Sequence, residues 1–268
     1  MSFKIGCQTY TWEMLGESWK SHLDDILDII SGVGFEGVEI SNNMIGHYFG
    51  KPEELKKVLS RKNLQLSAFA YSSSYGFSNP NYWDREMEGV KKAIDFLTFF
   101  PGSILSLGGA SISENLTREE GLLNACRFYQ GVGRLCKEKG ITLTVHPHSH
   151  HGSLIETEEE YQTLMTLTNS QFVKWNPDTG HIIRGGQDLI KCLSRYKTRI
   201  AHIHFKDVNK EGTWTPLGKG ICNFSEVISL LKETDYSGWI ILEEESELAR
   251  ERAKEVIAED LRVLQSLI

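Results

Sequence analysis

The sequence predicts a single α/β domain over residues 1–268, folded as a (β/α)8 TIM barrel. Strand-like and helix-like segments alternate strictly eight times along the chain, which calls for a parallel sheet. Eight such units in 268 residues fit a closed barrel. The alternative is an open, doubly wound sheet. The turn after the first strand, Gln8-Thr-Tyr-Thr-Trp12, lacks the Gly-x-Gly-x-x-Gly pattern expected of that fold.

The first half of the chain contains four of these units. Residues 4–12 alternate in polarity, as expected for a strand with one buried face. Apolar residues repeat at helical spacing in residues 19–33, and glycines mark the end of that helix. Pro52 suits the first turn of a helix over residues 53–62. The other predicted strands are 37–41, 64–71 and 103–108, and the other predicted helices are 82–100 and 117–139.

The second half repeats the pattern. Gly140 ends a helix and leads into a strand over residues 141–147. A strand begins at Val173 and stops at Pro177, which lacks the N–H that a sheet needs. The remaining predicted helices are 157–167, 188–196, 224–233 and 248–267, and the remaining strands are 200–207 and 239–244. The sequence shows no linker, low-complexity segment or second domain.

The bulk composition narrows the class of function. A formal net charge of -7 argues against a broad surface for nucleic acid or for an anionic membrane. The five cysteines include no Cys-x-x-Cys pair, so neither a disulfide framework nor a thiolate zinc site is predicted. The first residues lack a signal peptide's apolar run, and no segment is suited to span a bilayer. We therefore expect a cytoplasmic protein with a small-molecule partner; its assembly, including a homo-oligomer, is left open.

The first candidate site is the segment Val173-Lys-Trp-Asn-Pro-Asp-Thr-Gly-His181. Asp178 and His181 follow the predicted strand, and Gly180 would allow a tight turn between them. A carboxylate and an imidazole so close together suit a divalent metal. The alternative is an aspartate that caps a turn beside a histidine with a local hydrogen bond, because short patterns also match by chance.

Because side chains alternate between the two faces of a strand, further polar residues are predicted to face the barrel axis. If Ile203 and Phe205 face the helices, then His202, His204 and Lys206 face inward. The same alternation places two residues inward at the end of each of two other strands, His146 with His148 and Glu243 with Glu245. It turns Glu244 outward, away from the site.

Four neighbouring strands thus direct His146, Asp178, His204 and Glu243 at one rim. Burying four such groups at similar depth is costly unless they share a cation or a connected network. We therefore predict one divalent metal ion held by these residues, with His146 either a fourth ligand or a group that touches the ligands. Imidazoles with carboxylates favour Mn, Co, Zn or Fe over Ca.

Two loops invite weaker hypotheses. Pro216-Leu-Gly-Lys-Gly220 could cradle a phosphate or form a mobile cover over a substrate. His150 and His151, next to the His146–His148 strand end, are interpreted as a solvated rim.

Several motifs together resemble the xylose-isomerase-like TIM-barrel superfamily of sugar isomerases, epimerases and dehydratases. They are Gly37-Val-Glu39, Asp178-Thr-Gly-His181, His202-Ile-His-Phe-Lys-Asp207, Pro216-Leu-Gly-Lys-Gly220 and Gly238-Trp-Ile-Ile-Leu-Glu243. The nearest resemblance is to inosose (2-keto-myo-inositol) dehydratases, through His146-Pro-His148 followed by Gly152-Ser153. In the 3-epimerases of this superfamily the fifth strand ends in a glutamate, whereas this chain has His146.

The resemblance implies a metal-dependent lyase of inositol catabolism that forms an enediolate from a sugar or polyol ketone. His148 and Lys206 are the candidates for proton transfer and for stabilising the oxyanion. Glu39, His181 and Glu245 are the candidates for binding substrate hydroxyls or supporting the ligands.

Three alternatives remain open at this point. A sugar isomerase or 3-epimerase would use the same barrel. An abasic-site nuclease would need further histidines on early strands and a basic DNA face, but the second and third strands end at Ser41 and Tyr71. A non-catalytic sugar-binding barrel would not need all four metal-type side chains.

Overall fold

The computed structural model describes residues 3–150 and 152–268, and over these residues eight parallel strands form one sheet. Their order is β6-β5-β4-β3-β2-β1-β10-β7. Parallel bridges from Trp175 to Ile200 and from Asp178 to His204 join the two ends of the sheet. The strands are β1 (Lys4–Gln8), β2 (Gly37–Ser41), β3 (Gln65–Tyr71), β4 (Ile104–Gly108), β5 (Thr142–His146), β6 (Val173–Trp175), β7 (His202–Phe205) and β10 (Trp239–Leu242). The predicted barrel is therefore confirmed, and the open sheet is wrong.

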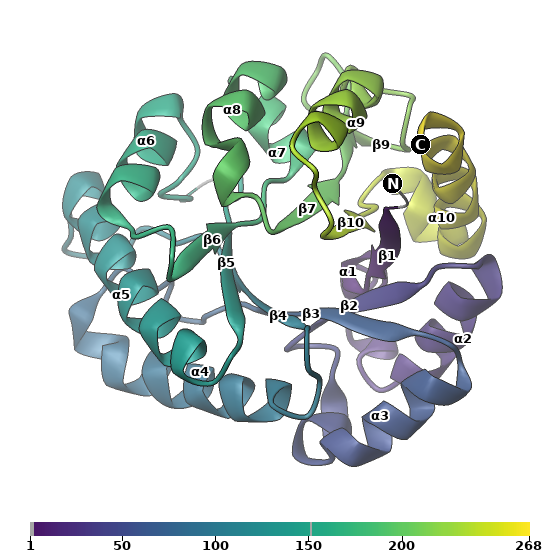
Figure 1. The fold of residues 1–268 in the computed structure, drawn as a ribbon, viewed down its shortest axis with the longest axis horizontal. Helices are drawn as coiled ribbons and strands as arrows, with labels where there is room; N and C mark the ends of the chain where they lie inside the picture. Colours follow the sequence, from purple (N-terminus) through teal and green to yellow (C-terminus); the bar gives the residue numbers. More distant parts are fainter. Residues whose placement is uncertain (1–2, 151) are drawn as a thin grey trace.

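The helices surround this ring of strands (Figure 1). They are α1 (Tyr10–Glu13), α2 (Leu23–Val33), α3 (Pro52–Arg61), α4 (Trp83–Leu97), α5 (Arg118–Glu138), α6 (Glu158–Leu167), α7 (Thr179–Arg184), α8 (Leu189–Tyr196), α9 (Phe224–Glu233) and α10 (Glu247–Leu267). Short 3-10 turns lie at Glu17–Trp19, Gly46–Gly50, Pro80–Tyr82 and Lys197–Arg199. Thr117 and Thr157 each begin a helix with a capping box, which satisfies N–H groups that the first turn leaves free.

Three local features differ from the sequence prediction. The first strand ends at Gln8, and helix α1 follows where the strand was expected to continue. Helix α7 begins directly after Asp178, because the Asp178 carboxylate caps its first turn. After β7 the chain forms a small antiparallel hairpin of β8 (Asp207–Val208) and β9 (Trp214–Thr215), which places Trp214 over the end of the barrel strands.

The strands bury both of their faces, as a parallel barrel requires. The faces toward the helices are apolar and include Val38, Leu105 and Phe205. Polar side chains meet across the barrel instead: Glu39 on β2 contacts His202 on β7, although 163 residues separate them in the sequence. The polar network at the site therefore extends down into the barrel.

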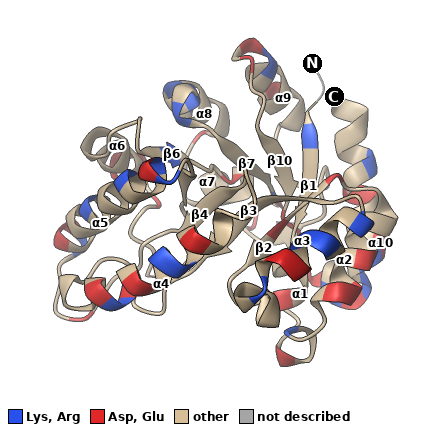
Figure 2. Cartoon of the chain, turned by 60° about the horizontal axis from the view of Figure 1, so that its bottom comes forward, with Lys and Arg blue, Asp and Glu red and all other residues tan. Residues whose placement is uncertain are grey.

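Acidic and basic residues alternate on the outer helices, as Figure 2 shows for α4 and α5. Among the described helices, none has the length and apolar character needed to cross a membrane.

Candidate active site

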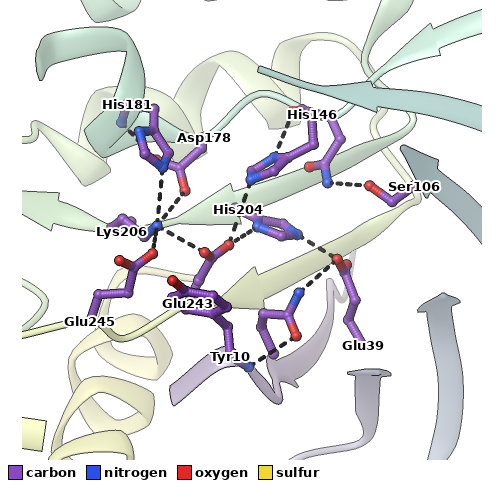
Figure 3. Close-up of polar contacts among 12 residues, drawn as sticks. Tyr10, Glu39, Ser106, His146, Asp178, His181, His204, Lys206, Glu243 and Glu245 are labelled. Atoms are coloured by element: carbon purple, nitrogen blue, oxygen red, sulfur yellow. Dashed lines mark hydrogen bonds and ion pairs between the residues drawn. The ribbon is translucent and has the colours of Figure 1, made fainter. Parts of the chain in front are cut away.

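Four buried side chains converge at the carboxyl end of the barrel, and they are the four that the strand periodicity predicted. His146, Asp178, His204 and Glu243 each offer one ligand atom, and these atoms lie within 4.8 Å of one another. They come from β5, the start of α7, β7 and the end of β10, so the fold assembles them from strands that are neighbours in the closed ring (Figure 3).

His146 and Asp178 each have one polar atom engaged and one free. His146 Nδ1 lies 3.2 Å from the carbonyl oxygen of Asn176, and Asp178 Oδ1 accepts the backbone N–H of His181 at 2.8 Å. Within the described residues, His146 Nε2 and Asp178 Oδ2 are buried and have no hydrogen-bond partner. Burial, together with the charge of His204, lowers the pKa of His146 to about 3. His146 is therefore a neutral imidazole, the form that binds a metal.

His204 and Glu243 follow the same pattern. His204 Nε2 lies 3.0 Å from Glu39 Oε2, and Glu243 Oε1 accepts a hydrogen bond from Lys206 Nζ at 2.8 Å. The remaining atoms, His204 Nδ1 and Glu243 Oε2, contact each other, and Glu243 Oε2 lies 3.7 Å from His146 Nε2. Every member of the set thus turns one atom toward a common space while its other atom is fixed by the protein. This arrangement of nitrogen and oxygen donors fits a divalent transition metal.

Glu39 lies beneath the set and connects it to the barrel interior. Its Oε2 contacts His202 Nε2 at 2.5 Å as well as His204, and its Oε1 accepts from Gln8 Nε2 at 3.1 Å. Burial acts to raise the pKa of Glu39, but the charges of His204 and His202 outweigh it and hold that pKa well below its usual range. Burial likewise opposes the charge on His204, yet Glu39 and Glu243 raise the pKa of His204 to about 10. Without a metal the ring is therefore protonated, and a metal ion would displace the proton on Nδ1. Both carboxylate oxygens of Glu39 are engaged and one supports His204, and Glu39 also lines the pocket beside the metal-type set.

Lys206 is a buried ammonium among carboxylates. Its Nζ contacts Glu245, lies 2.8 Å from Glu243 Oε1 and 3.6 Å from Asp178 Oδ2. Burial disfavours its charge, but Glu243 and Glu245 outweigh burial and raise the pKa of Lys206 well above its usual value. Burial raises the pKa of Glu245 to about 7, although Lys206 opposes that rise. Lys206 is therefore held as an ammonium that donates hydrogen bonds to these carboxylates.

His148, His150 and His181 form a second histidine group near the rim, also with donor atoms within 4.8 Å of one another. Both ring nitrogens of His181 face donors: the N–H of Ser149 lies 2.9 Å from Nδ1, and Lys206 Nζ lies 3.3 Å from Nε2. Burial and Lys206 hold the pKa of His181 well below its usual range, which keeps the ring neutral. Neither nitrogen of His181 is free for a cation, so the first group is the better metal centre.

A pocket of about 230 Å³ opens beside the metal-type set. His146, Glu243, His148 and Glu245 are among the residues that line it. Further lining residues were not predicted to belong to the site, chiefly Gln8, Tyr10, Glu13, Ser41 and Ser106. Gln8 and Ser41 end β1 and β2, Tyr10 and Glu13 follow β1, and Ser106 lies within β4, so the rule that barrel sites lie at strand ends was the available signal for the first four. His150 also lines the pocket and is exposed, in line with the predicted rim, while His151 lies outside the described residues.

The predicted turn at Gly180 is wrong, because Gly180 lies within helix α7. A Cβ at this position would lie 2.9 Å from the Trp214 ring and 3.1 Å from Lys206 Cγ. The missing side chain therefore makes room for Trp214, whose ring lies 4.9 Å from Lys206 Nζ. The alternative interpretation of Asp178 as a cap is correct for one of its oxygens, and the other oxygen is free for a ligand.

The phosphate interpretation of the 216–220 loop is also wrong. The N–H groups of Gly218 and Gly220 donate to Asp207 Oδ2 at 2.9 and 2.8 Å, and Cys222 N–H donates to Asp207 Oδ1 at 3.1 Å. A carboxylate of the chain thus occupies the place that a phosphate would take, and it anchors this loop.

Glu244 points away from the site as predicted, and it is buried behind the strand. Its carboxylate accepts the N–H of Ser246, and it neighbours Asp260 on α10. Burial, with a hydrogen bond from Asp260 to Glu244, raises the pKa of Asp260 to about 9. We refer to Glu244 and Asp260 as the rear acid pair.

Comparison with known proteins places the chain in a family. The family model described as xylose isomerase-like TIM barrel matches residues 27–267. The chain belongs to this family. Curated relatives include an inosose dehydratase of Clostridium beijerinckii, 30% identical over 247 residues that cover 81% of this chain and 80% of the relative. The inosose dehydratase of Clostridium tetani is 27% identical over 280 residues, covering 92% and 91%.

Solved structures share the fold of this xylose isomerase-like chain. The IOLI protein with a bound zinc atom has a TM-score of 0.79 at 16% identity, covering 99% of each chain. The probable 3-DHS dehydratase AsbF of Bacillus anthracis has a TM-score of 0.78 at 18% identity, covering 98% of each chain. An L-ribulose 3-epimerase has a TM-score of 0.79 at 16% identity, covering 99% of this chain and 96% of its own.

Proposed function

We propose that this chain is a divalent-metal-dependent dehydratase that acts on a polyhydroxy ketone of the inosose type. The observation that carries the proposal is the buried set of His146, Asp178, His204 and Glu243, in which each residue keeps one donor atom for a common centre. Its curated relatives are named inosose dehydratases, which supports elimination of water as the reaction.

The metal set would hold the ion through His146 Nε2, Asp178 Oδ2, His204 Nδ1 and Glu243 Oε2. When bound, the ion would polarise the ketone and a neighbouring hydroxyl, which lowers the energy of an enediolate. Manganese, cobalt, zinc and iron all suit these donors, and zinc in the IOLI neighbour is one precedent on this fold.

His148 is the proposed base. It lines the pocket beside His146, and burial holds its pKa well below the usual range, so the resting ring is neutral and keeps one unprotonated nitrogen. In the proposed reaction His148 takes the proton α to the carbonyl, and the electron pair forms the enediolate. The β-hydroxide then leaves and receives the same proton from the imidazolium, so that one water is lost.

The neighbouring groups hold the substrate and the charge. Glu245 lines the pocket and would accept hydrogen bonds from substrate hydroxyls. Lys206, through Glu243 and Glu245, would keep positive charge near the enediolate. His181, whose Nε2 lies 3.3 Å from Lys206 Nζ, would hold the ammonium in place, and Glu39 would orient His204.

Metal analysis tests the site. The purified protein should bind about one divalent transition metal per chain, and Asp178→Ala should abolish that binding while the fold remains. Full metal binding by the Asp178→Ala protein would show that the metal centre is assigned to the wrong residues. Circular dichroism of the variant checks the fold.

Turnover of a keto-polyol panel in D2O, followed by NMR, tests the reaction. We expect a keto-inositol or a related ketone to lose water. An epimerase must move protons on both faces of one carbon, and here β5 offers His146 where the 3-epimerases have glutamate. Deuterium entering a ketose at C3 with inversion, and no dehydrated product from any substrate, would instead establish the epimerase.

A further inference from the structure

Lys206 sits at the centre of the carboxylates of the site. Its Nζ contacts Glu245, lies 2.8 Å from Glu243 Oε1 and 3.6 Å from Asp178 Oδ2, and its side chain is fully buried (Figure 3). An ammonium so placed offsets the cost of burying the carboxylates around it.

Two of those three carboxylates belong to the proposed metal set, but Lys206 uses them differently. On Glu243 the ammonium contacts Oε1, whereas Oε2 faces His204 and His146, so Glu243 can serve both cations. On Asp178 the oxygen nearest to Lys206 is Oδ2, the same atom that is free for a metal. The ammonium and a metal ion would therefore share Asp178.

The position of the ammonium is fixed by the fold. Lys206 N–H donates to Thr179 Oγ1 at 3.0 Å, and Thr179 Oγ1 donates to the Lys206 carbonyl at 2.7 Å, which pins the backbone to helix α7. The Trp214 ring covers the ammonium at 4.9 Å. Glu245, outside the metal set, holds it from the remaining side. Lys206 therefore stays beside the centre when a metal enters.

We propose that Lys206 is an internal counter-cation that holds the metal-free site together and weakens its affinity for a divalent ion. Without metal, the ammonium stabilises the buried carboxylates. With metal, two cations share Asp178 and Glu243 at short range, and their repulsion lowers affinity. Lys206 is thus a positioning residue that sets metal affinity through the ligands. The inference rests on the metal centre proposed above.

Titration of the metal-free protein with Mn²⁺ by calorimetry tests this inference, together with the melting temperature in the presence and absence of Mn²⁺. In Lys206→Met we expect Kd for Mn²⁺ to fall by about tenfold or more, because one competing charge is gone. We expect Tm of the metal-free variant to fall below that of the wild type, so that Mn²⁺ raises Tm by more than in the wild type. An unchanged or higher Kd overturns the inference.

Arg184→Met is the matched control. Arg184 stacks on the same Trp214 ring at 4.7 Å, and the ion pairs of the described residues include none between Arg184 and a carboxylate. Its Kd should stay at the wild-type value. A fall equal to that of Lys206→Met would mean that any nearby cation acts, and it would overturn the specific role of Lys206.

A second variant keeps the test decisive if Lys206→Met does not fold. Glu245→Gln leaves the ammonium with only Asp178 and Glu243, so Kd should rise; an unchanged or lower Kd contradicts the inference. Wild-type protein that binds no metal would overturn the proposed function itself. Wild-type binding with an unaltered Kd in Lys206→Met would overturn only the role of Lys206.

Discussion

Glu243 and Glu244 are consecutive, both buried, and chemically alike, yet the barrel puts them in opposite surroundings. Glu243 faces Lys206 and His204; burial acts to raise its pKa, but these cations hold that pKa well below its usual range. Glu244 faces Asp260 behind the strand, where a proton is retained on Asp260, whose pKa is about 9. A buried carboxylate such as Glu243 thus stays charged where the fold supplies cations, whereas Asp260, which meets another carboxylate, keeps its proton.

The largest expected effect on turnover is that of substituting Glu243, the residue of these two glutamates that faces the barrel axis. Glu243→Gln removes a negative donor from the proposed metal centre and a partner of Lys206. Turnover of the keto-polyol substrate should fall by roughly 10³-fold. Steady-state kinetics with saturating metal measures it. A variant with wild-type turnover would mean that Glu243 is not a metal ligand.

The next effect concerns the support of His204. Glu39→Gln replaces the carboxylate that accepts from His204 and His202, so His204 Nδ1 becomes a weaker and less well oriented donor. Metal affinity should drop by about 10- to 100-fold. Calorimetric titration gives Kd, and the visible spectrum of the Co²⁺ form reports on the geometry. An unaltered Kd and spectrum would show that Glu39 does not act through His204.

A smaller effect is expected in the rear acid pair, on stability rather than on activity. The pKa of Asp260 is raised from 3.8 to about 9 on folding, so its contribution to stability is complete below pH 4 and is lost as pH rises toward 9. Asp260→Asn keeps an acceptor for Leu217 N–H and removes the ionisation. The variant should gain about 1–3 kcal/mol over the wild type at pH 8, and less at pH 5.

Urea unfolding at the two pH values measures this gain. Asp188→Asn is the control, since Asp188 caps α8 at an exposed position. If Asp260→Asn is no more stabilising at pH 8 than at pH 5, Asp260 is not protonated in the folded protein.

The smallest expected effect is on turnover in Glu244→Gln. The substitution keeps the oxygen that accepts Ser246 N–H and lies on the far side of the strand from the pocket. Its kcat should stay within about twofold of the wild type. The pair Glu243→Gln and Glu244→Gln thus tests the register of β10: a reversed pattern would mean that the inner and outer faces are exchanged.

Much of the site follows from local pattern. The alternation of strands and helices predicted the barrel, and the period of two predicted which of His202 to Lys206 and of Glu243 to Glu245 face the axis. The structure brings the four metal-type side chains together, while their roles, like the single-domain assignment, stay predictions. Helix α7 was not predicted, because the residues after Pro177 were assigned to a turn. In the structure the Asp178 carboxylate caps this helix by accepting the N–H of His181.

Other features depend on contacts between residues far apart in the chain. The Asp207 carboxylate accepts N–H groups of the glycine-rich 216–220 loop, and Asp260 contacts Glu244, 16 residues away in the sequence. Neither pairing can be predicted from a local sequence pattern. The pairing of Lys206 with Glu243, and of Glu39 with His204, likewise needs the barrel to close. The alternation of side chains along a strand follows from backbone geometry and can be predicted from the sequence alone. Which buried charge meets which partner depends on the three-dimensional arrangement of the strands, and that pairing decides both protonation and metal affinity.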